Sequence, residues 1–184
     1  DGPRFSAVKF SSFAEMGESL RNDDIQVAFI IAPLAIVLRQ QGENVKVVYI
    51  GNRHESTLVA ESSLKAKSFA DLEGKTVAVP MRYSGHNLSM LELIERHGMQ
   101  ERIKVVEMNP PDMASALAAG ALPPYYVGEP FAAPTVKSGD SNVVFHVEKV
   151  WPGFICNLAL VRNDFIQKEP EIVQRLVTGA VRSG

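Results

Sequence analysis

The segment from Met81 to Asn87 gathers the residue types best suited to holding a small ligand. It follows an apolar run typical of a strand and precedes a run with helical apolar spacing, so it is predicted to start a helix. A helix start presents N–H groups and the positive end of the helix dipole, which attract anions. Gly85 permits close backbone approach, while Arg82 and His86 add side-chain donors. The alternative interpretation is a plain N-cap at Ser84 beside a solvated arginine.

A second polar segment, Gly51 to Ser56, lies between two apolar runs. Its His54 and Glu55 are suited to binding a ligand amine, and polar loops held by a rigid scaffold often carry function. The alternative is a surface turn in which Glu55 pairs with Arg53, an exposed ion pair of little energetic value. The residue types leave both interpretations open.

Further candidates lie at other predicted strand ends and helix starts. Ser11 and Ser12 come where a first helix is expected to begin, and Ala32-Pro33 comes at the equivalent point after the next strand. Glu129 is expected to begin a later helix, where a carboxylate is favoured by the dipole. Helix capping is the alternative role for the serines and for Glu129.

Trp151 is the aromatic residue with the strongest claim to line a ligand site, although packing between elements is the commoner role of such a residue. The single cysteine, Cys156, lies in an apolar run and is expected to be buried and inert. One cysteine excludes a disulfide framework. The sequence contains no GxSxG, HExxH or P-loop motif, and no metal site or cofactor is predicted.

Composition excludes several classes of protein. The 184 residues are 46% hydrophobic and 22% charged with a net charge of -2, which is typical of a globular chain and gives no basic footprint for nucleic acid. No apolar run approaches the ~20 residues that span a bilayer, so direct membrane insertion is not expected.

Apolar strand-like runs alternate with helical patterns along the chain. Strands are predicted at 5–10, 25–31, 45–50, 57–60, 76–79, 103–108, 125–127, 143–147 and 157–161, and helices at 13–21, 34–41, 84–98, 111–120, 128–138 and 170–177. The runs at 25–31 and 45–50 are predicted to be buried strands, the former in a parallel sheet. Repeated βαβ units predict an α/β fold with mixed sheets, and so many strands predict two lobes. We expect a first lobe over 1–62, a second over 63–150, and a return to the first over 151–184, with Trp151-Pro152-Gly153 in the crossing back.

Four segments resemble one known family. They are Ser68–Pro80 (SFADLEGKTVAVP), Ala114–Phe131, Asp23–Leu34 and Val161–Leu176. In this order they resemble the type 2 periplasmic binding proteins, in the nitrate/sulfonate/taurine and thiamine-precursor (NMT1-like) branch of ABC transporter substrate-binding proteins. Leu122-Pro123-Pro124 departs from the family pattern, and proline there weakens the prediction of a local strand.

The resemblance implies a two-lobed fold truncated at both ends, with a ligand in the interlobe cleft and no cofactor. It implies a solute-binding protein, periplasmic or lipid-anchored outside the cytoplasm, that delivers a small, anionic ligand to an ABC transporter permease. Residue types and resemblance together give the candidate ligand-binding set of Ser11, Ser12, Ala32, Pro33, His54, Glu55, Arg82, Ser84, Gly85, His86, Glu129 and Trp151.

Two other functions are compatible with the same fold. One is an enzyme similar to a desulfinase or a pyrimidine synthase, for which His54 and Glu55 are the acid/base candidates. The other is the ligand-sensing effector domain of a regulator. Fold alone does not separate these functions from transport.

Overall fold

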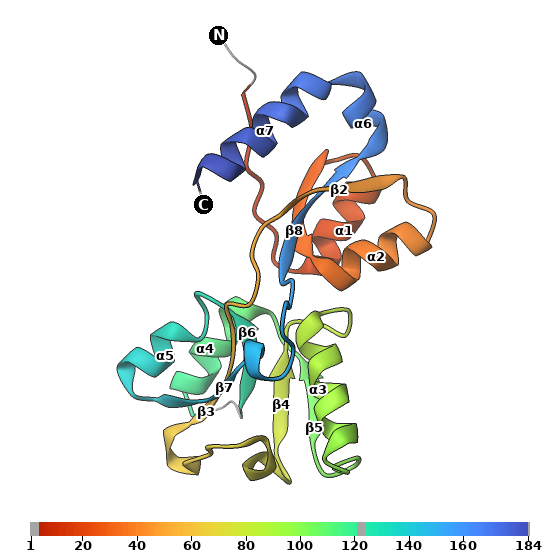
Figure 1. Ribbon diagram of the computed structural model, residues 1–184. Helices are drawn as coiled ribbons and strands as arrows, with labels where there is room; N and C mark the ends of the chain where they lie inside the picture. The colour runs from red at the N-terminus through yellow and green to blue at the C-terminus, as the bar shows by residue number, and fades with distance from the viewer. Residues whose placement is uncertain (1–3, 121–123, 184) are drawn as a thin grey trace. The chain divides into compact units, whose positions relative to one another are not determined.

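The computed structural model describes residues 4–120 and 124–183, which form two compact units (Figure 1). The first unit contains Asp1–Asn52 and Asn157–Gly184, and the second contains Arg53–Cys156. The chain therefore passes between the units twice, at 52/53 and at 156/157.

The first unit is built on a three-stranded antiparallel sheet with the order β1-β8-β2. Its elements are α1 (Phe13–Arg21), β1 (Val27–Ile31), α2 (Ala32–Gln40), β2 (Val45–Ile50), β8 (Asn157–Arg162), α6 (Asn163–Lys168) and α7 (Pro170–Ser183). The middle strand comes from the far end of the sequence, and Leu160 and Val161 on it are buried. Helix α1 packs against α2, since a Cβ on Gly17 would lie 3.8 Å from the Leu38 side chain.

Three predictions for the first unit are wrong. Residues 5–10 form no strand, because no strand in the described part of the chain pairs with them and a β ladder needs a partner. The strand at 27–31 is antiparallel rather than parallel, because an apolar run reports burial and not direction. The strand at 45–50 is an edge strand, and Val47 on it is 51% exposed.

The second unit is built on a five-stranded mixed sheet with the order β5-β4-β6-β3-β7, which confirms the α/β class with a mixed sheet. Its elements are β3 (Ser56–Glu61), η1 (Ser62–Leu64), η2 (Phe69–Leu72), β4 (Thr76–Val79), α3 (Gly85–Arg96), β5 (Lys104–Glu107), α4 (Pro110–Ala118), β6 (Tyr125–Gly128), α5 (Ala133–Ser138), β7 (Ser141–His146) and η3 (Val147–Lys149).

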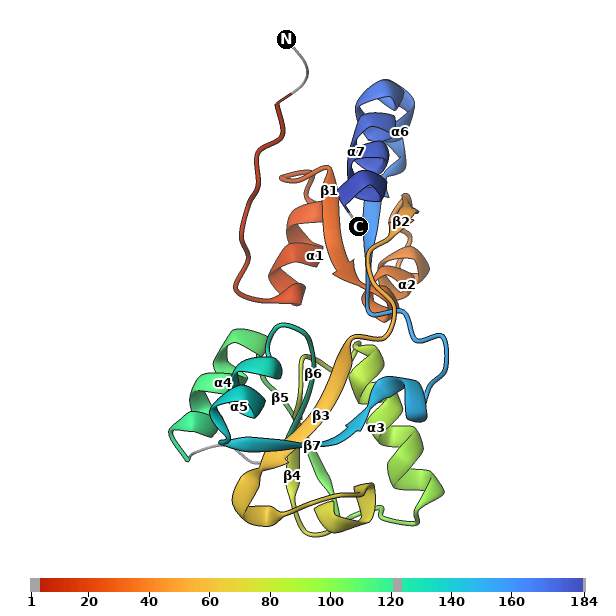
Figure 2. The same ribbon diagram turned by 60° about the vertical axis from the view of Figure 1, so that its left-hand side comes forward.

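Helices cover both faces of this sheet, with α3 on one side and α4 and α5 on the other (Figure 2). Neighbouring residues of one strand serve opposite faces, as strand geometry requires. Val77 and Val79 belong to the cluster that includes Met90 of α3, while Ala78 belongs to the cluster that includes Met113 of α4. The continuous apolar runs of β3, β4 and β6 are explained by this double coverage.

Two features of the second unit differ from expectation. The unit begins at Arg53 and ends at Cys156, not at 63 and 150, because β3 pairs with both β6 and β7 in the middle of this sheet. Helix α5 begins at Ala133 and not at 128, because Pro134 suits a first helical turn and residues 128–131 form a turn closed by the Phe131 N–H and the Gly128 carbonyl. In the segment that departs from the family pattern, residues 121–123 lie outside the described residues, and Pro124 accepts a backbone hydrogen bond from Ala78 at 2.9 Å.

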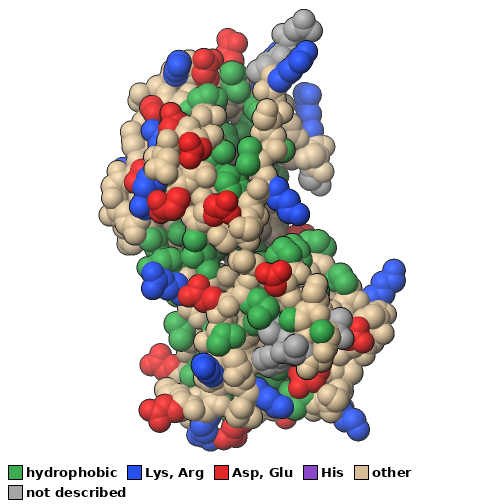
Figure 3. Space-filling model, turned by 180° about the vertical axis from the view of Figure 1, so that it is seen from behind, with side chains coloured by type: hydrophobic (Ala, Val, Ile, Leu, Met, Phe, Trp, Pro, Cys, Tyr) green, Lys and Arg blue, Asp and Glu red, His purple; other side chains and the backbone are tan. Residues whose placement is uncertain are grey.

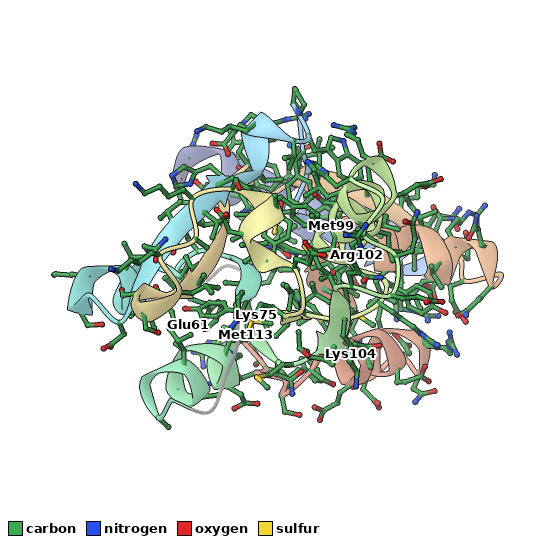
Figure 4. All side chains as sticks on the ribbon, turned by 90° about the horizontal axis from the view of Figure 1, so that it is seen from below. Glu61, Lys75, Met99, Arg102, Lys104 and Met113 are labelled. Atoms are coloured by element: carbon green, nitrogen blue, oxygen red, sulfur yellow. The ribbon has the colours of Figure 1, made fainter. Side chains whose placement is uncertain are left out.

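Ion pairs lie at one end of the strands of the second sheet. There β3 ends at Glu61 and β4 begins after Lys75, and the Lys75 Nζ lies 3.8 Å from the Glu61 Oε1 (Figure 4). Arg102, near the start of β5, is paired with Glu73 at 2.7 Å. The ligand-binding candidates of this unit lie elsewhere.

The surface shows no concentration of one sign of charge on the face drawn in Figure 3, where Lys and Arg side chains are interspersed with Asp and Glu. Among the helices of residues 4–120 and 124–183, none has the length and apolarity needed to cross a membrane.

Candidate functional site

The polar candidates of the second unit lie at the opposite ends of its strands, called below the switch-point edge. Strands β4, β5 and β6 run parallel, and β3 is antiparallel to β6 and β7, so the carboxyl ends of four strands and the start of β3 share one edge. The chain leaves β4 for β5 on one side and then returns to β6 on the other side. Such a switch point, outside the carboxyl ends of the strands, is where open α/β sheets bind ligands.

Helix α3 begins at this switch point. The Ser84 hydroxyl accepts the Asn87 N–H at 3.1 Å and donates to the Met81 carbonyl at 2.7 Å, so Ser84 is a satisfied N-cap. The first helical N–H groups, those of Gly85 and His86, have no intrahelical acceptor, as at any helix start, and both residues are buried. The capping alternative is therefore correct for the Ser84 side chain, and a ligand role for the two amides stays a prediction.

Arg82 adds positive charge beside this helix start. Its side chain is exposed, and its guanidinium carbon lies 4.8 Å from the centre of the Tyr83 ring. The Arg82 carbonyl accepts a hydrogen bond from the Asn87 amide at 3.0 Å, which fixes the loop against the first turn of α3. An exposed guanidinium next to a helix start is suited to a charge-assisted hydrogen bond with an anion.

His86 faces inward from the same helix start. Its ring is 2% exposed, and its Nε2 lies 2.9 Å from the Ser56 Oγ. The rings of Tyr126 and Phe154 lie edge-on to it at 5.0 and 5.5 Å. Burial lowers the pKa of His86 to about 3, so the ring is neutral at neutral pH. The expectation that this side chain donates to a ligand does not fit its burial, and the backbone N–H is what His86 can offer.

Gly85 is required by close packing. A Cβ at this position would lie 2.4 Å from Cε2 of Phe154, a distance at which the ring would have to move. Glycine therefore allows the helix start to pack against Phe154.

Glu129 lies at the same edge, directly after β6. Its Oε2 accepts the Ala133 N–H at the start of α5 at 2.9 Å, and its Oε1 lies 3.5 Å from the Thr57 hydroxyl. The Thr57 hydroxyl is also 3.2 Å from Nδ1 of His146, the last residue of β7. The side chains of Glu129 and His146 are exposed, so a carboxylate and an imidazole are presented together at the switch-point edge.

His54 and Glu55 lie before β3 at this edge, and both have a left-handed backbone, with φ of 59° and 51°. The His54 Nε2 accepts the Gly153 N–H at 3.0 Å, and the Glu55 carbonyl accepts the Glu129 N–H at 2.8 Å. The histidine therefore holds a second chain segment in place.

The candidates of the first unit lie at helix starts. Helices α1 and α2 begin at the same end of the sheet, where β1 ends (Figures 1 and 2). The Ser12 hydroxyl accepts the Glu15 N–H at 3.1 Å, and the Ser11 N–H and hydroxyl both donate to the Glu15 carboxylate. The hydrogen bond from the Ser11 hydroxyl lowers the pKa of Glu15. Ala32 and Pro33 form the first turn of α2. A ligand role for these four residues stays a prediction.

Trp151 lies in a different setting from the other candidates. Its side chain is 41% exposed and lines a surface hollow of about 370 Å³ with α3 residues, among them Leu88 and Glu92. Its ring lies 5.5 Å from that of Phe154. The hollow runs along the flank of α3 and not at the switch-point edge.

Sequence reasoning missed Thr57, His146 and Phe154. The first two lie at strand ends that only the strand order brings beside Glu129, so no local pattern could have found them. Phe154 follows the Trp-Pro-Gly segment, whose residue types indicate a crossing between lobes and give no sign of close packing. In the part of the chain that the structure describes, no group of three or more His, Cys, Asp or Glu residues is placed to hold a metal ion.

Comparison with known proteins finds ligand-binding proteins among the relatives of this chain. The Escherichia coli (strain K12) taurine-binding periplasmic protein is 27% identical over 179 residues, covering 94% of this chain and 54% of that protein. The ligand-binding component of an ABC-type import system from Staphylococcus aureus, solved with zinc bound, superposes with a TM-score of 0.80 at 24% identity, covering 94% of this chain and 60% of that one.

The alkanesulfonate-binding protein from Xanthomonas axonopodis pv. citri, bound to MOPS, gives a TM-score of 0.79 at 18% identity, covering 94% of this chain and 61% of that one. These likenesses confirm the fold predicted from the four sequence segments. This chain spans about half the length of the curated relatives it matches. The model of the NMT1-like family matches residues 2–184, and the chain belongs to the NMT1-like family.

Proposed function

We propose that this chain is a solute-binding protein that captures a small anionic ligand of the nitrate or sulfonate type for delivery to an ABC importer. The observation that carries the proposal is the start of α3, where the amides of Gly85 and His86 lie beside the exposed Arg82 at the switch-point edge. Relatives whose names state taurine or alkanesulfonate binding support an anion of this kind.

In this proposal, backbone amides and the exposed Arg82 guanidinium bind the ligand. Amide donors are preorganised by the helix, so they lose little conformational freedom on binding, while Arg82 moves onto the anion and gives a charge-assisted bond. Ser11, Ser12, Ala32 and Pro33 are the proposed contribution of the first unit. Ligand binding then shifts the population between open and closed arrangements of the two units.

Glu129 extends the proposal to zwitterionic ligands. A carboxylate exposed at the same edge as the anion-binding amides is placed to accept hydrogen bonds from a ligand ammonium group. His146 and Thr57, which share its hydrogen-bond cluster, are proposed to set the position of the carboxylate.

The proposal includes no catalytic role. The Nε2 of His54, the best acid/base candidate of the sequence, is occupied by the Gly153 N–H, so its lone pair is engaged in a structural hydrogen bond. The proposed partners are a small-molecule ligand and the permease of an ABC transporter, and the proposed location is outside the cytoplasm.

Isothermal titration calorimetry with taurine, methanesulfonate, nitrate and choline tests the proposal. We expect heat of binding for at least one anion and none for the cation choline. Arg82→Ala should weaken anion binding about tenfold, the loss of roughly one charge-assisted hydrogen bond. Arg96→Ala is the matched control, because Arg96 ends the same helix and is paired with Glu92 at 2.8 Å. Absence of binding by all three anions, or equal losses in the two variants, would contradict the proposal.

A further inference from the structure

The two segments that join the units leave the second unit side by side. The units join at 52/53 and at 156/157. Just inside the second unit, Arg53 forms an antiparallel bridge with Ile155, and the His54 N–H donates to the Phe154 carbonyl at 2.9 Å. Residues 53–56 and 154–156, called here the two connections, are therefore a hydrogen-bonded pair.

The second connection is packed against the start of α3. The Phe154 side chain occupies the space that a Cβ on Gly85 would need, at 2.4 and 2.7 Å from its ring carbons. Because Phe154 is 2% exposed and packed in the core of the second unit, its ring has little room to move away. A displacement of Gly85, the first residue of α3, would therefore also displace the second connection.

The first connection is hydrogen-bonded to the next residue of α3. The His86 Nε2 lies 2.9 Å from the Ser56 Oγ, and both residues are buried. A ring protonated on Nε2 donates to Ser56, whose own hydroxyl then donates to the His54 carbonyl at 3.3 Å. The other tautomer would leave a buried N–H on Nδ1, which has no partner among the described residues, so the first arrangement is favoured.

We propose that His86, Ser56 and Phe154 are positioning residues that link the anion-binding start of α3 to both connections between the units. The inference rests on the proposed function, because it concerns how an anion bound to the amides of Gly85 and His86 affects the two connections. An anion bound to these amides favours one position of the first turn of α3. The Phe154 ring and the His86–Ser56 hydrogen bond couple this position to both connections. Ligand binding therefore favours one conformation of the two connections.

The side chains concerned are buried, so their effect on a ligand is indirect. The chain also carries its own reporter, since Trp151 is the sequence's single tryptophan and its ring lies 5.5 Å from that of Phe154. A change at Phe154 on ligand binding should therefore alter Trp151 fluorescence, although Trp151 itself lies on the flank of α3.

The test uses the full chain with taurine, methanesulfonate and nitrate as probes. Ser56→Ala and His86→Leu remove the hydrogen bond, whereas His86→Gln keeps a donor near the position of Nε2. Ser89→Ala is the matched control, because Ser89 is a buried serine of α3 whose hydroxyl reaches Tyr126 at 3.4 Å and not the connections. For the probe that binds the unmodified chain, we expect Ser56→Ala and His86→Leu to lose about tenfold in affinity together with the ligand-induced change in Trp151 emission. His86→Gln and Ser89→Ala should keep both within about threefold.

Unchanged affinity and unchanged Trp151 response in Ser56→Ala would overturn the inference, and so would equal losses in Ser89→Ala. Hydrogen exchange measured without ligand tests the inference even if no anion binds, so it separates failure of the inference from failure of the proposed function. It also tests the inference if the His86→Leu chain does not fold. In Ser56→Ala, the amides of residues 53–56 and those of Asn87 and Leu88 should lose protection together if they are linked. Loss confined to one of the two segments would overturn the link even if every anion fails to bind.

Discussion

The Glu129 Oε1 lies 3.5 Å from the Thr57 Oγ1, across the pair formed by β3 and β6. Together with the hydrogen bond from the Ala133 N–H to the Glu129 Oε2, this contact fixes the carboxylate at the edge where four strands end. The carboxylate is both a cap for α5 and an exposed negative charge, and these two roles respond differently to substitution.

Glu129→Gln should discriminate between zwitterionic and purely anionic ligands. The amide keeps an oxygen for the Ala133 N–H but loses the negative charge, so affinity for taurine should fall about tenfold while affinity for methanesulfonate stays the same or rises. Calorimetric titration of both compounds into both chains measures the difference. Parallel losses for the two ligands would assign Glu129 to capping alone.

Gly85→Ala should destabilise the second unit. The new methyl group would lie 2.4 Å from the Phe154 ring in a closely packed core, and overpacking of this kind costs about 1–3 kcal/mol. Urea unfolding followed by circular dichroism measures the change in the free energy of unfolding. The matched control is Gly179→Ala in α7, where a Cβ meets nothing within 4 Å and the chain should gain roughly 0.5–1 kcal/mol from helix propensity. Similar values for the two variants would contradict the packing at Gly85.

Stability should fall as the pH is lowered below about 6.5. The unfolded chain protonates His86 near the ordinary histidine pKa of 6.5, whereas burial lowers the pKa of His86 in the folded chain to about 3. Between these values the unfolded state binds more protons, so the free energy of unfolding decreases as pH falls, with a limiting slope of about 1.4 kcal/mol per pH unit.

The control for this pH effect is His86→Gln, which cannot be protonated. Its free energy of unfolding, measured in urea from pH 7 to pH 4.5, should fall less steeply than that of the unmodified chain. Identical slopes would mean that the His86 ring takes up its proton equally well in the folded and unfolded chains.

Ser12→Asp separates capping from ligand contact in the first unit. Aspartate is as good an N-cap as serine, so the free energy of unfolding should change little, whereas Ser12→Ala should cost about 1 kcal/mol. If Ser12 faces the ligand as proposed, the added negative charge of Ser12→Asp should weaken anion binding at least about tenfold by repulsion. Unchanged affinity in Ser12→Asp would leave Ser12 with its capping role only.

Local patterns predicted those parts of the fold that depend on neighbouring residues. The strand at Thr76–Val79 and the N-cap at Ser84 have the predicted positions, because an apolar strand followed by a serine and helical spacing specifies them locally. The four family-like segments then gave the fold class, which the superpositions confirm. What failed depended on distant partners: the direction of Val27–Ile31 is set by a strand 126 to 134 positions further along the chain.

The residues of the candidate site also divide into those that local patterns predicted and those that depend on distant partners. Arg82, Gly85 and Glu129 could be selected from residue type and from position at predicted helix starts. The inward orientation of His86 could not, because it depends on Ser56 thirty residues earlier and on the rings of Tyr126 and Phe154. The cluster of Thr57 and His146 likewise exists only once β7 lies beside β3.

The central place of β8 in the first sheet has a consequence for synthesis on the ribosome. Strands β1 and β2 each pair with β8 and not with each other, so the first sheet cannot close until residue 162 has been translated and has left the exit tunnel. The second unit, a continuous stretch from Arg53 to Cys156, is complete before that point. Synthesis from the N-terminus therefore makes the second unit able to fold before the first sheet closes, because residues 13–50 lack their central strand until β8 is present. Pulse proteolysis of ribosome-bound chains halted shortly after Cys156 emerges should find the second unit protected and residues 13–50 cleaved.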